Sequence, residues 1–340
     1  MHYVPFLKIK QGEFAALNNL TNEVFDRIKP YHLFVDDTNE VRKGSYFETF
    51  SKPMSKIYQE KKHSCFVDFS QFKSISAIDI CEYFRAESFN FTIVIKNLLV
   101  DSQIAEYLKT KNPAENGIAI LFDASQQYNF NELNLRLNKL KEFLGVDSSS
   151  IDLILQFGYI TSSQFGYHVA AFEKFKNTID GFEDFRNVII GAGSFPKDLG
   201  NFKSGTVTQI PRYELQLFQV LQKTLVRSLV YGDFGNLHSV YDPEAGGFEG
   251  SASLKYTTDE NFVIYRGSKP SEHAEGFGQY VTQCKSLISS TYFDGANFSF
   301  GDDQIYKCGN GLLSKTGNAT TWITNTLNHH ITKVSDQQLQ

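Results

Sequence analysis

Several features common in other protein classes are missing from this 340-residue sequence. No apolar run approaches the roughly 18 residues of a membrane-spanning helix, and the first residues lack the charged and apolar regions of a secretory signal. The cysteines, Cys65, Cys81, Cys284 and Cys308, lie far apart without C-x-x-C spacing, so they indicate neither a zinc site nor a disulfide framework. We therefore expect a cytoplasmic protein with reduced thiols and no membrane partner.

Signatures of well-known enzyme classes are missing as well. The chain has no G-x-S-x-G, no Walker G-x-x-x-x-G-K-[ST], no H-E-x-x-H, and no G-x-G-x-x-G after its first predicted strand. An excess of basic charge is also missing, because the formal net charge is -5. Nucleic acid is therefore not an expected partner, while reaction type and cofactor stay open.

What the sequence does contain is a rhythm of eight short apolar runs with helix-patterned segments between them. The runs are residues 4–9, 31–36, 65–69, 91–96, 118–123, 151–156, 187–191 and 229–233. Their ends are roughly 27 to 42 residues apart, about one strand, one helix and two loops. Because a strand and its amphipathic helix cannot bury their own apolar faces, eight such units close most economically into a (β/α)8 barrel of the TIM type.

The chain is longer than the roughly 250 residues typical of such a barrel, so insertions are expected. We predict a barrel domain over residues 1–290, with a polar loop after the second strand over residues 38–62 and a β-hairpin insertion at about 250–267. Residues 291–340 form a C-terminal extension packed on the barrel. Helices are predicted at residues 12–28, 75–87, 103–111, 131–144, 163–179, 215–225 and 277–288.

The ends of the predicted strands carry the candidate functional residues, because parallel strands meet at one barrel mouth. They supply Lys8, Lys10, Asp68, Lys96, Asp123, Gln156 and Asp233, together with the Gly-Ala-Gly-Ser turn that contains Gly193 and Ser194. Lysines suit an anionic substrate, and a carboxylate can act as acid, base or metal ligand. The glycine turn occupies the place where many barrels bind phosphate through backbone N–H groups.

Structural interpretations of the same residues stay open. Lysine and aspartate inside a barrel can pair for packing alone, and glycines also end strands. The adjacent His329 and His330 would point to opposite faces of a strand, which disfavours a shared metal ion. Asp302 and Asp303 are typical of a turn or of a docked carboxylate. The lysines of residues 38–62 suit either a solvated loop or an electrostatic guide for an acidic partner.

Several phrases along the chain resemble those of the phage and bacterial "beta protein" family. They are residues 4–13 (VPFLKIKQGE), 193–196 (GSFP), 211–214 (PRYE), 231–235 (YGDFG), 298–302 (FSFGD), and Trp322 with 328–332 (NHHIT). The family's tail segment usually reads W-R, whereas Ile323 follows Trp322 here. The resemblance implies a compact cytoplasmic protein that often accompanies defence genes, and it supplies no reaction. It marks as a common site Lys8, Lys10, Glu13, Arg212, Glu214, Asp233, Asp302, Trp322, His329 and His330.

Two hypotheses for function follow, and a third, an inert structural scaffold, remains open beside them. The first is a binding or sensing module of antiphage defence or phage counterdefence, whose barrel mouth recognises a protein partner or a small anionic ligand. The second is a hydrolytic or phosphoryl-transfer enzyme. In it, Lys8, Lys10 and Arg212 hold the anion, Asp233 or Glu214 is the general base, and His329 or His330 closes the pocket.

Overall fold

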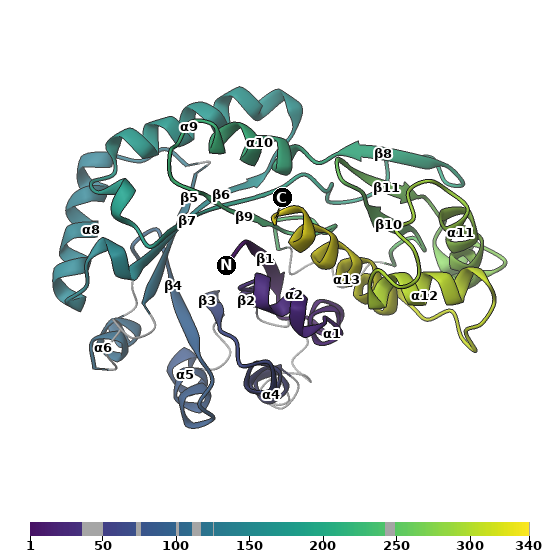
Figure 1. Cartoon of the computed structure of the whole chain (residues 1–340), viewed down its shortest axis with the longest axis horizontal. Helices are drawn as coiled ribbons and strands as arrows, with labels where there is room; N and C mark the ends of the chain where they lie inside the picture. The colour runs from purple at the N-terminus through teal and green to yellow at the C-terminus, as the bar shows by residue number, and fades with distance from the viewer. Residues whose placement is uncertain are drawn as a thin grey trace. The chain divides into compact units, whose positions relative to one another are not determined.

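The computed structural model describes residues 1–35, 50–72, 76–99, 102–110, 117–124, 126–241 and 249–339 (Figure 1). The chain divides into two compact units. The barrel unit comprises Met1–Ile9, Ile28–Gly193 and Tyr213–Phe234. The second unit comprises Lys10–Arg27, Ser194–Arg212 and Gly235–Gln340. Among the helices of the described ranges, none has the length and apolar character to cross a membrane.

The barrel unit contains a closed barrel of parallel strands, which confirms the predicted (β/α)8 fold. In barrel order the strands are β1 (Tyr3–Lys8), β2 (Tyr31–Val35), β3 (Cys65–Gln71), β4 (Phe91–Lys96), β5 (Ile118–Asp123), β6 (Ile151–Tyr159), β7 (Asn187–Gly193) and β9 (Val230–Asp233). β9 pairs in parallel with β1, with Tyr3 opposite Tyr231, and this pairing closes the cylinder. Every apolar run that the sequence predicted as a barrel strand is one.

Helices surround this barrel on its outside (Figure 1). They are α4 (Lys52–Lys61), α5 (Ala77–Ala86), α6 (Ser102–Thr110), α8 (Phe130–Leu144), α9 (Phe165–Thr178) and α10 (Tyr213–Gln222). α8 shows why its sequence is helical. The side chain of Asn129 caps the first turn by accepting from the backbone N–H of Glu132, and Gly145 ends the helix in the left-handed conformation. α4 lies within the predicted loop 38–62, whereas residues 36–49 lie outside the described residues.

Polar side chains close the foot of the barrel, at the N-terminal ends of the strands. Asp152 accepts hydrogen bonds from Arg186 Nε at 2.9 Å, Arg186 Nη2 at 2.7 Å and Asn187 Nδ2 at 2.7 Å. The ammonium of Lys29 lies 3.6 Å from the same carboxylate and donates to the Thr92 hydroxyl at 3.0 Å. Each described charge at the foot therefore has a partner.

The second unit contains an antiparallel sheet in the order β10 (Leu254–Thr257), β11 (Asn261–Tyr265) and β8 (Val207–Pro211). The predicted hairpin is confirmed as β10 and β11. β8 was missed, because its five residues alternate between exposed and half-buried positions and read as part of a polar loop. Residues 235–290, which include the hairpin, group with the tail rather than with the barrel strands.

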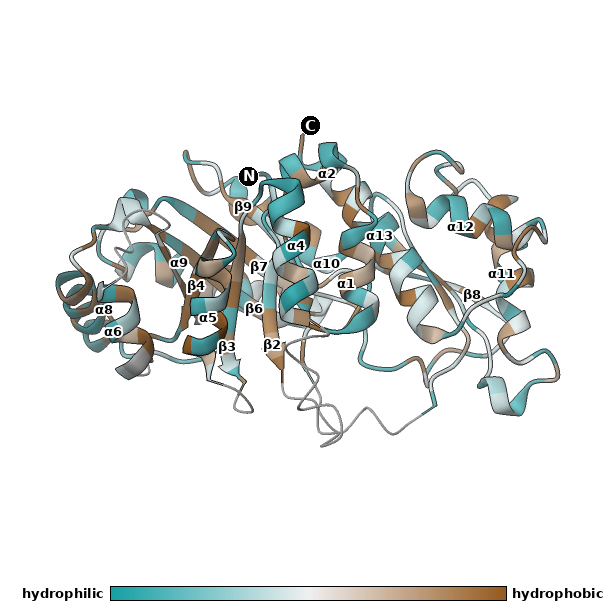
Figure 2. Ribbon diagram, turned by 90° about the horizontal axis from the view of Figure 1, so that it is seen from below, coloured by the Kyte–Doolittle hydropathy of each residue, from teal (hydrophilic) through white to brown (hydrophobic). Residues whose placement is uncertain are grey.

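The helices of the second unit are α1 (Gln11–Asn18), α2 (Asn22–Arg27), α11 (Gln279–Ile288), α12 (Phe300–Gly309) and α13 (Ala319–Gln337). The predicted helix 12–28 is thus two helices. Asn19 Nδ2 donates to the carbonyl of Ala15 and ends the first, and the Thr21 hydroxyl accepts from the backbone N–H of Val24 and begins the second. Figure 2 shows mixed hydrophilic and hydrophobic colour along α13. Its buried residues include Asn325 and Asn328, so the sequence of α13 lacks the regular spacing of apolar residues that is typical of an amphipathic helix.

Candidate functional site

The interior of the barrel fixes which strand residues can face its mouth. Its buried cluster consists of Val4, Phe6, Tyr31, Phe66, Val94, Ala119, Leu121, Ile154, Ile189, Val230 and Phe234. Side chains alternate along a strand, so residues two positions further toward the C-terminal ends face inward as well. These residues are Lys8, Asp68, Lys96, Asp123 and Gln156. We call them the mouth layer, and they are the predicted site residues that the barrel brings together.

An aromatic floor lies beneath the mouth layer. The Phe6 ring packs against Tyr31, with centroids 4.6 Å apart, and against Phe234 at 5.1 Å. Gly191 and Gly232 leave space for this ring, because a Cβ atom there would lie 2.8 Å and 2.6 Å from Phe6 atoms respectively. The floor therefore separates the polar layer from the apolar interior further down the barrel.

Asp68 is held by groups of the barrel itself. The Tyr31 hydroxyl donates to Asp68 Oδ2, and the backbone N–H of Ser70 donates to Oδ1 at 2.7 Å. Burial, reinforced by the charge of Asp68, raises the pKa of Tyr31, so its hydroxyl stays a donor. Tyr31 was missed as a site residue, because nothing in its apolar run distinguishes it from a packing aromatic.

A left-handed turn directly follows β4 and hydrogen-bonds to the end of β5. Asn97 and Leu98 have φ values of 52° and 57°, a conformation that costs a non-glycine residue about 1 kcal/mol or more. Asn97 Oδ1 accepts from the Tyr128 hydroxyl at 2.7 Å and from the backbone N–H of Asp123 at 3.2 Å. Neither Asn97 nor Tyr128 was predicted. Asparagine after a strand is a weak signal for this conformation, and Tyr128 carries none.

Polar side chains gather at the ends of the neighbouring strands β4, β5 and β6. Asp123 lies directly opposite Gln156 in the ladder, and its Oδ2 accepts from Gln126 at 3.2 Å. Within the described part of the chain, the ammonium of Lys96 and the side-chain amide of Gln156 have no hydrogen-bond or ion-pair partner. Lys96, Asp123 and Gln156 are all half-buried. An ammonium, a carboxylate and an amide thus face one partly desolvated space.

The predicted phosphate-binding turn after the seventh strand requires a correction. Gly193 belongs to β7, where it pairs with Tyr159, and its carbonyl accepts from the backbone N–H of Ile160 at 2.8 Å. Gly191 is small because Phe6 packs against it. Ser194 is buried in the second unit, and its hydroxyl donates to the Pro211 carbonyl at 3.3 Å. These glycines therefore serve strand packing and do not form an open turn of backbone donors.

Asp233 was predicted to face the mouth, and that prediction is wrong. Its neighbours Gly232 and Phe234 face the interior, so Asp233 lies on the outer face of β9. Its carboxylate accepts from the Tyr3 hydroxyl at 2.6 Å and the Tyr231 hydroxyl at 2.9 Å. Glu214, on α10, lies 3.5 Å from the Tyr231 hydroxyl. Both carboxylates are buried in the barrel wall, away from the interior.

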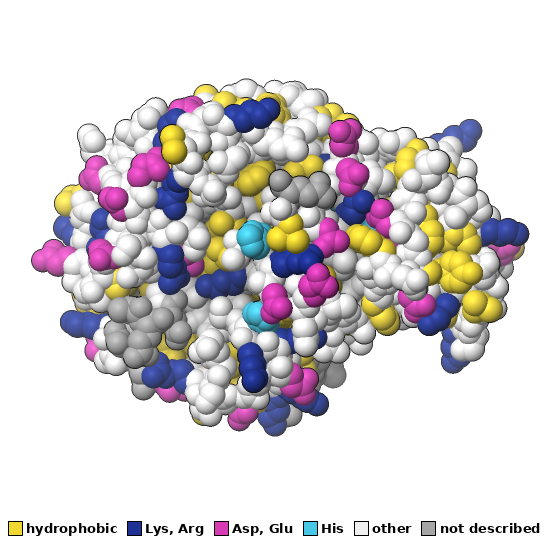
Figure 3. All heavy atoms as spheres, in the orientation of Figure 1, with side chains coloured by type: hydrophobic (Ala, Val, Ile, Leu, Met, Phe, Trp, Pro, Cys, Tyr) yellow, Lys and Arg dark blue, Asp and Glu magenta, His cyan; other side chains and the backbone are white. Residues whose placement is uncertain are grey.

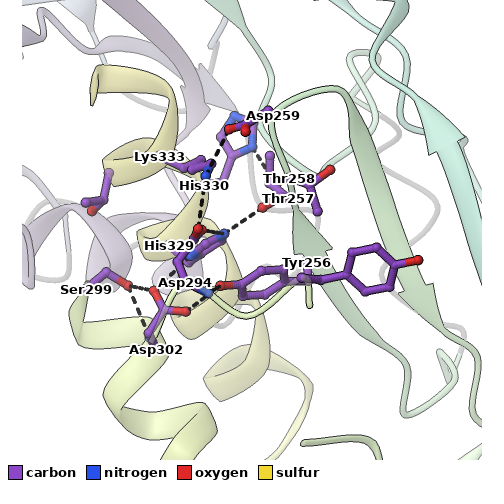
Figure 4. A network of polar contacts seen from close by, with 12 residues as sticks. Tyr256, Thr257, Thr258, Asp259, Asp294, Ser299, Asp302, His329, His330 and Lys333 are labelled. Atoms are coloured by element: carbon purple, nitrogen blue, oxygen red, sulfur yellow. Dashed lines mark hydrogen bonds and ion pairs between the residues drawn. The ribbon is translucent and has the colours of Figure 1, made fainter. Parts of the chain in front are cut away.

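Asp302 and His329 form a buried hydrogen-bonded pair in the second unit (Figure 4). His329 Nδ1 lies 2.8 Å from Asp302 Oδ2, and Nε2 lies 2.8 Å from the Thr257 carbonyl oxygen. The ring is thus held at both nitrogens, on one side by a carboxylate and on the other by a backbone carbonyl. Burial acts to raise the pKa of Asp302, but His329 and hydrogen bonds from Ser299 and Tyr256 hold it below its ordinary value. The Tyr256 ring stacks on His329 at 3.9 Å.

The other predicted residues of the second unit also have structural contacts there. Arg212 Nη1 donates to Gln337 Oε1 at 2.8 Å and to the carbonyls of Thr258 and Asp259. His330 Nδ1 lies 2.8 Å from the Thr257 hydroxyl.

Trp322 and Lys10 complete this set. Trp322 stacks on Tyr280 at 4.5 Å, and Lys10 is exposed, with its ammonium over the Tyr241 ring. His329 and His330 lie on a helix rather than on the assumed strand, and Asp302 lies in the first turn of α12 rather than in a connecting turn.

The predicted site residues thus fall into two groups, one in each compact unit. Among the described residues, no group of three or more His, Cys, Asp or Glu side chains is placed to hold a metal ion. The mouth layer combines strand-end position with half-buried side chains at every member except Asp68, and Lys96 and Gln156 have no partner among the described residues. We take it as the candidate site.

Comparisons with known proteins identify a family for nearly the whole chain. A family model described as Beta protein matches residues 3–336. No curated protein matches the chain. Among solved structures, a mutant tryptophan synthase α-subunit from the hyperthermophile Pyrococcus furiosus is similar, with 9% sequence identity and a TM-score of 0.39. That match covers 69% of this chain and 87% of the other, and nothing about function is transferred from it.

Proposed function

The chain belongs to the Beta protein family, and from that premise we propose that it is a binding module whose barrel mouth holds a small anionic ligand. One observation carries the proposal. The mouth layer presents Lys96 and Gln156 without partners among the described residues, above an aromatic floor. Concave sites with a few convergent polar groups on apolar walls are the usual form of small-molecule sites.

The charges of the mouth layer favour an anion over a cation. Both carboxylates already accept hydrogen bonds from the barrel unit, Asp68 from Tyr31 and Ser70, and Asp123 from Gln126. The Lys96 ammonium has no described counter-charge. An anionic group therefore fits Lys96, with Lys8 as a second cation of the layer. A hydroxyl or amine of the same ligand fits Asp123 and Gln156.

The biological setting is part of the same proposal. The resemblance of the sequence to a family that accompanies defence genes supports a cytoplasmic sensor in antiphage defence or phage counterdefence. A protein partner is the alternative ligand in that setting. On the face shown in Figure 3, cationic and acidic side chains are interspersed rather than gathered by sign. This pattern favours a compact ligand in the mouth over a long polyanion on the surface.

The enzyme hypothesis has less support from the geometry. It required Asp233 or Glu214 as the base, and both carboxylates lie in the barrel wall, bonded to or beside tyrosine hydroxyls. A base must reach the proton that it removes, so neither residue suits a substrate bound in the mouth. Binding is therefore the function that the arrangement supports best.

Inorganic phosphate is the probe that tests the proposal. We expect calorimetric titration to detect phosphate binding to the wild-type protein, and Lys96→Gln to weaken that binding at least tenfold. Lys223→Gln removes an exposed lysine of the same unit and is the matched control, with no expected effect. Absence of phosphate binding at millimolar concentration, or equal affinity of wild type and Lys96→Gln, would overturn the proposal.

A further inference from the structure

Two of the cysteines meet in the second unit although they are distant in the sequence. Cys284 lies on α11 and Cys308 near the end of α12, where the residue after Cys308 approaches the backbone of Cys284. Both side chains are buried in one apolar cluster with Tyr280 and Trp322. The pair therefore forms a preassembled dithiol.

Gly309 explains how the two helices approach so closely at this point. A Cβ atom at Gly309 would lie 3.0 Å from the backbone carbon of Cys284 and 3.0 Å from the backbone nitrogen of Lys285. The backbone of α11 thus passes directly over the residue that follows Cys308. Only a residue without a side chain allows this contact without displacing a helix.

The thiols of the pair also differ from the other cysteines in acidity. Burial raises the pKa of Cys65, Cys81 and Cys284. The hydrogen bond that Cys284 donates lowers the pKa of Cys308, which makes its sulfur the better thiolate. The more acidic thiol thus lies in the same cluster as a second thiol that can resolve a sulfenic acid.

We propose that Cys284 and Cys308 form a modification site that hydrogen peroxide converts to a disulfide between α11 and α12. The Cys308 thiolate attacks one peroxide oxygen, the O–O bond breaks, and hydroxide leaves, which gives a sulfenic acid. The sulfur of Cys284 then attacks the Cys308 sulfur, the S–O bond breaks, and the thiol proton leaves with the oxygen as water. In sum, two thiols and one hydrogen peroxide give one disulfide and two waters, and two electrons pass from sulfur to oxygen.

Because both thiols are buried, only a small oxidant can reach them. Cys284 and Cys308 are 0% and 1% exposed, so a bulky disulfide has no direct approach to either sulfur. Hydrogen peroxide is little larger than water and needs only a local opening at the end of α12. The same burial keeps the disulfide from reduction by large thiols once it has formed.

Peptide mass spectrometry on the full-length protein tests this proposal. After treatment with hydrogen peroxide and alkylation, we expect a peptide cross-linked through Cys284 and Cys308, which is lighter than the two free peptides by two hydrogen atoms. Cys284→Ser and Cys308→Ser must each abolish the cross-link, and Cys81→Ser, a buried cysteine of the barrel unit, must leave it unchanged. Separate oxidation of the two thiols without the cross-link, or no reaction with peroxide, overturns the proposal.

A second variant tests the geometry without removing either thiol. Gly309→Ala adds one methyl group at the helix contact, and we expect it to slow cross-link formation at least tenfold. Circular dichroism checks that this variant keeps its helices. Cross-linking of a folded Gly309→Ala protein at the wild-type rate contradicts the close approach on which the proposal depends.

Discussion

The foot and the mouth of the barrel carry similar charged side chains in different states. At the foot, Asp152 is almost fully buried and binds Arg186, Asn187 and Lys29. At the mouth, Lys96 and Gln156 have no partner among the described residues, and Asp123 is half-buried. Lysine and aspartate inside a barrel can thus serve packing, as they do at the foot. At the mouth, Lys96 and Gln156 present polar groups that can bind a ligand.

The largest expected effect comes from removing the central carboxylate of the foot. Asp152→Ala leaves Arg186 and Lys29 without their shared partner, and breaking a buried ion pair costs about 3 to 5 kcal/mol. Asp123→Ala, the matched change at the mouth, should cost about 1 kcal/mol or less. Urea unfolding measures both free energies, and equal losses would contradict the comparison.

His32 is a buried histidine that belongs to neither the foot nor the mouth of the barrel. It shows how burial alone, without a charged partner, changes a side-chain pKa. Burial lowers the pKa of His32 to about 3. Below its unfolded pKa of about 6.5, the unfolded chain binds a proton that the folded chain does not. The free energy of unfolding therefore keeps its full value above pH 6.5. On acidification toward pH 3 it falls by about 1.4 kcal/mol per pH unit. His168, whose pKa is also lowered by burial, adds a slope in the same direction.

Urea unfolding at pH 7, 6 and 5 measures this slope, and His32→Phe should reduce it. The ring of Phe cannot titrate, while its volume keeps the packing beside Tyr58. An unchanged slope in His32→Phe would show that His32 is not the neutral buried group described here.

The smallest expected effect comes from the lysine of the foot. Burial lowers the pKa of Lys29 even though Asp152 acts to raise it, so its charge contributes little net stability. Lys29→Met keeps the apolar stem over Phe66 and leaves Arg186 and Asn187 on Asp152. We expect a loss of about 1 kcal/mol or less in urea unfolding. A loss as large as that of Asp152→Ala would mean that Lys29, not Arg186, is the main partner at the foot.

The strands of the barrel could be predicted from the sequence because each is a continuous apolar run, but the face of each end residue could not. Parallel barrel strands are buried on both faces, so the run does not show which residues point inward. Asp123 and Asp233 both end apolar runs, yet Asp123 faces the mouth and Asp233 lies in the wall. Which residues of a strand point inward follows only from their packing partners, such as Phe6.

The second unit was harder to predict, because its core contains many polar side chains. α13 buries Asn328, His329 and His330 against partners from distant segments, so it shows no apolar stripe. The contact between Cys284 and Cys308 left no trace in their spacing either, since it depends on how α11 crosses α12 at Gly309.

Lysine reactivity tests the central comparison most directly. Brief acetylation with acetic anhydride, read by peptide mass spectrometry, compares Lys96 at the mouth with Lys29 at the foot in one protein, with and without inorganic phosphate. We expect Lys96 to react faster than Lys29, and phosphate to protect Lys96 while leaving the slow reaction of Lys29 unchanged. Equal reactivity of the two lysines, or no protection of Lys96 by phosphate, would contradict this expectation.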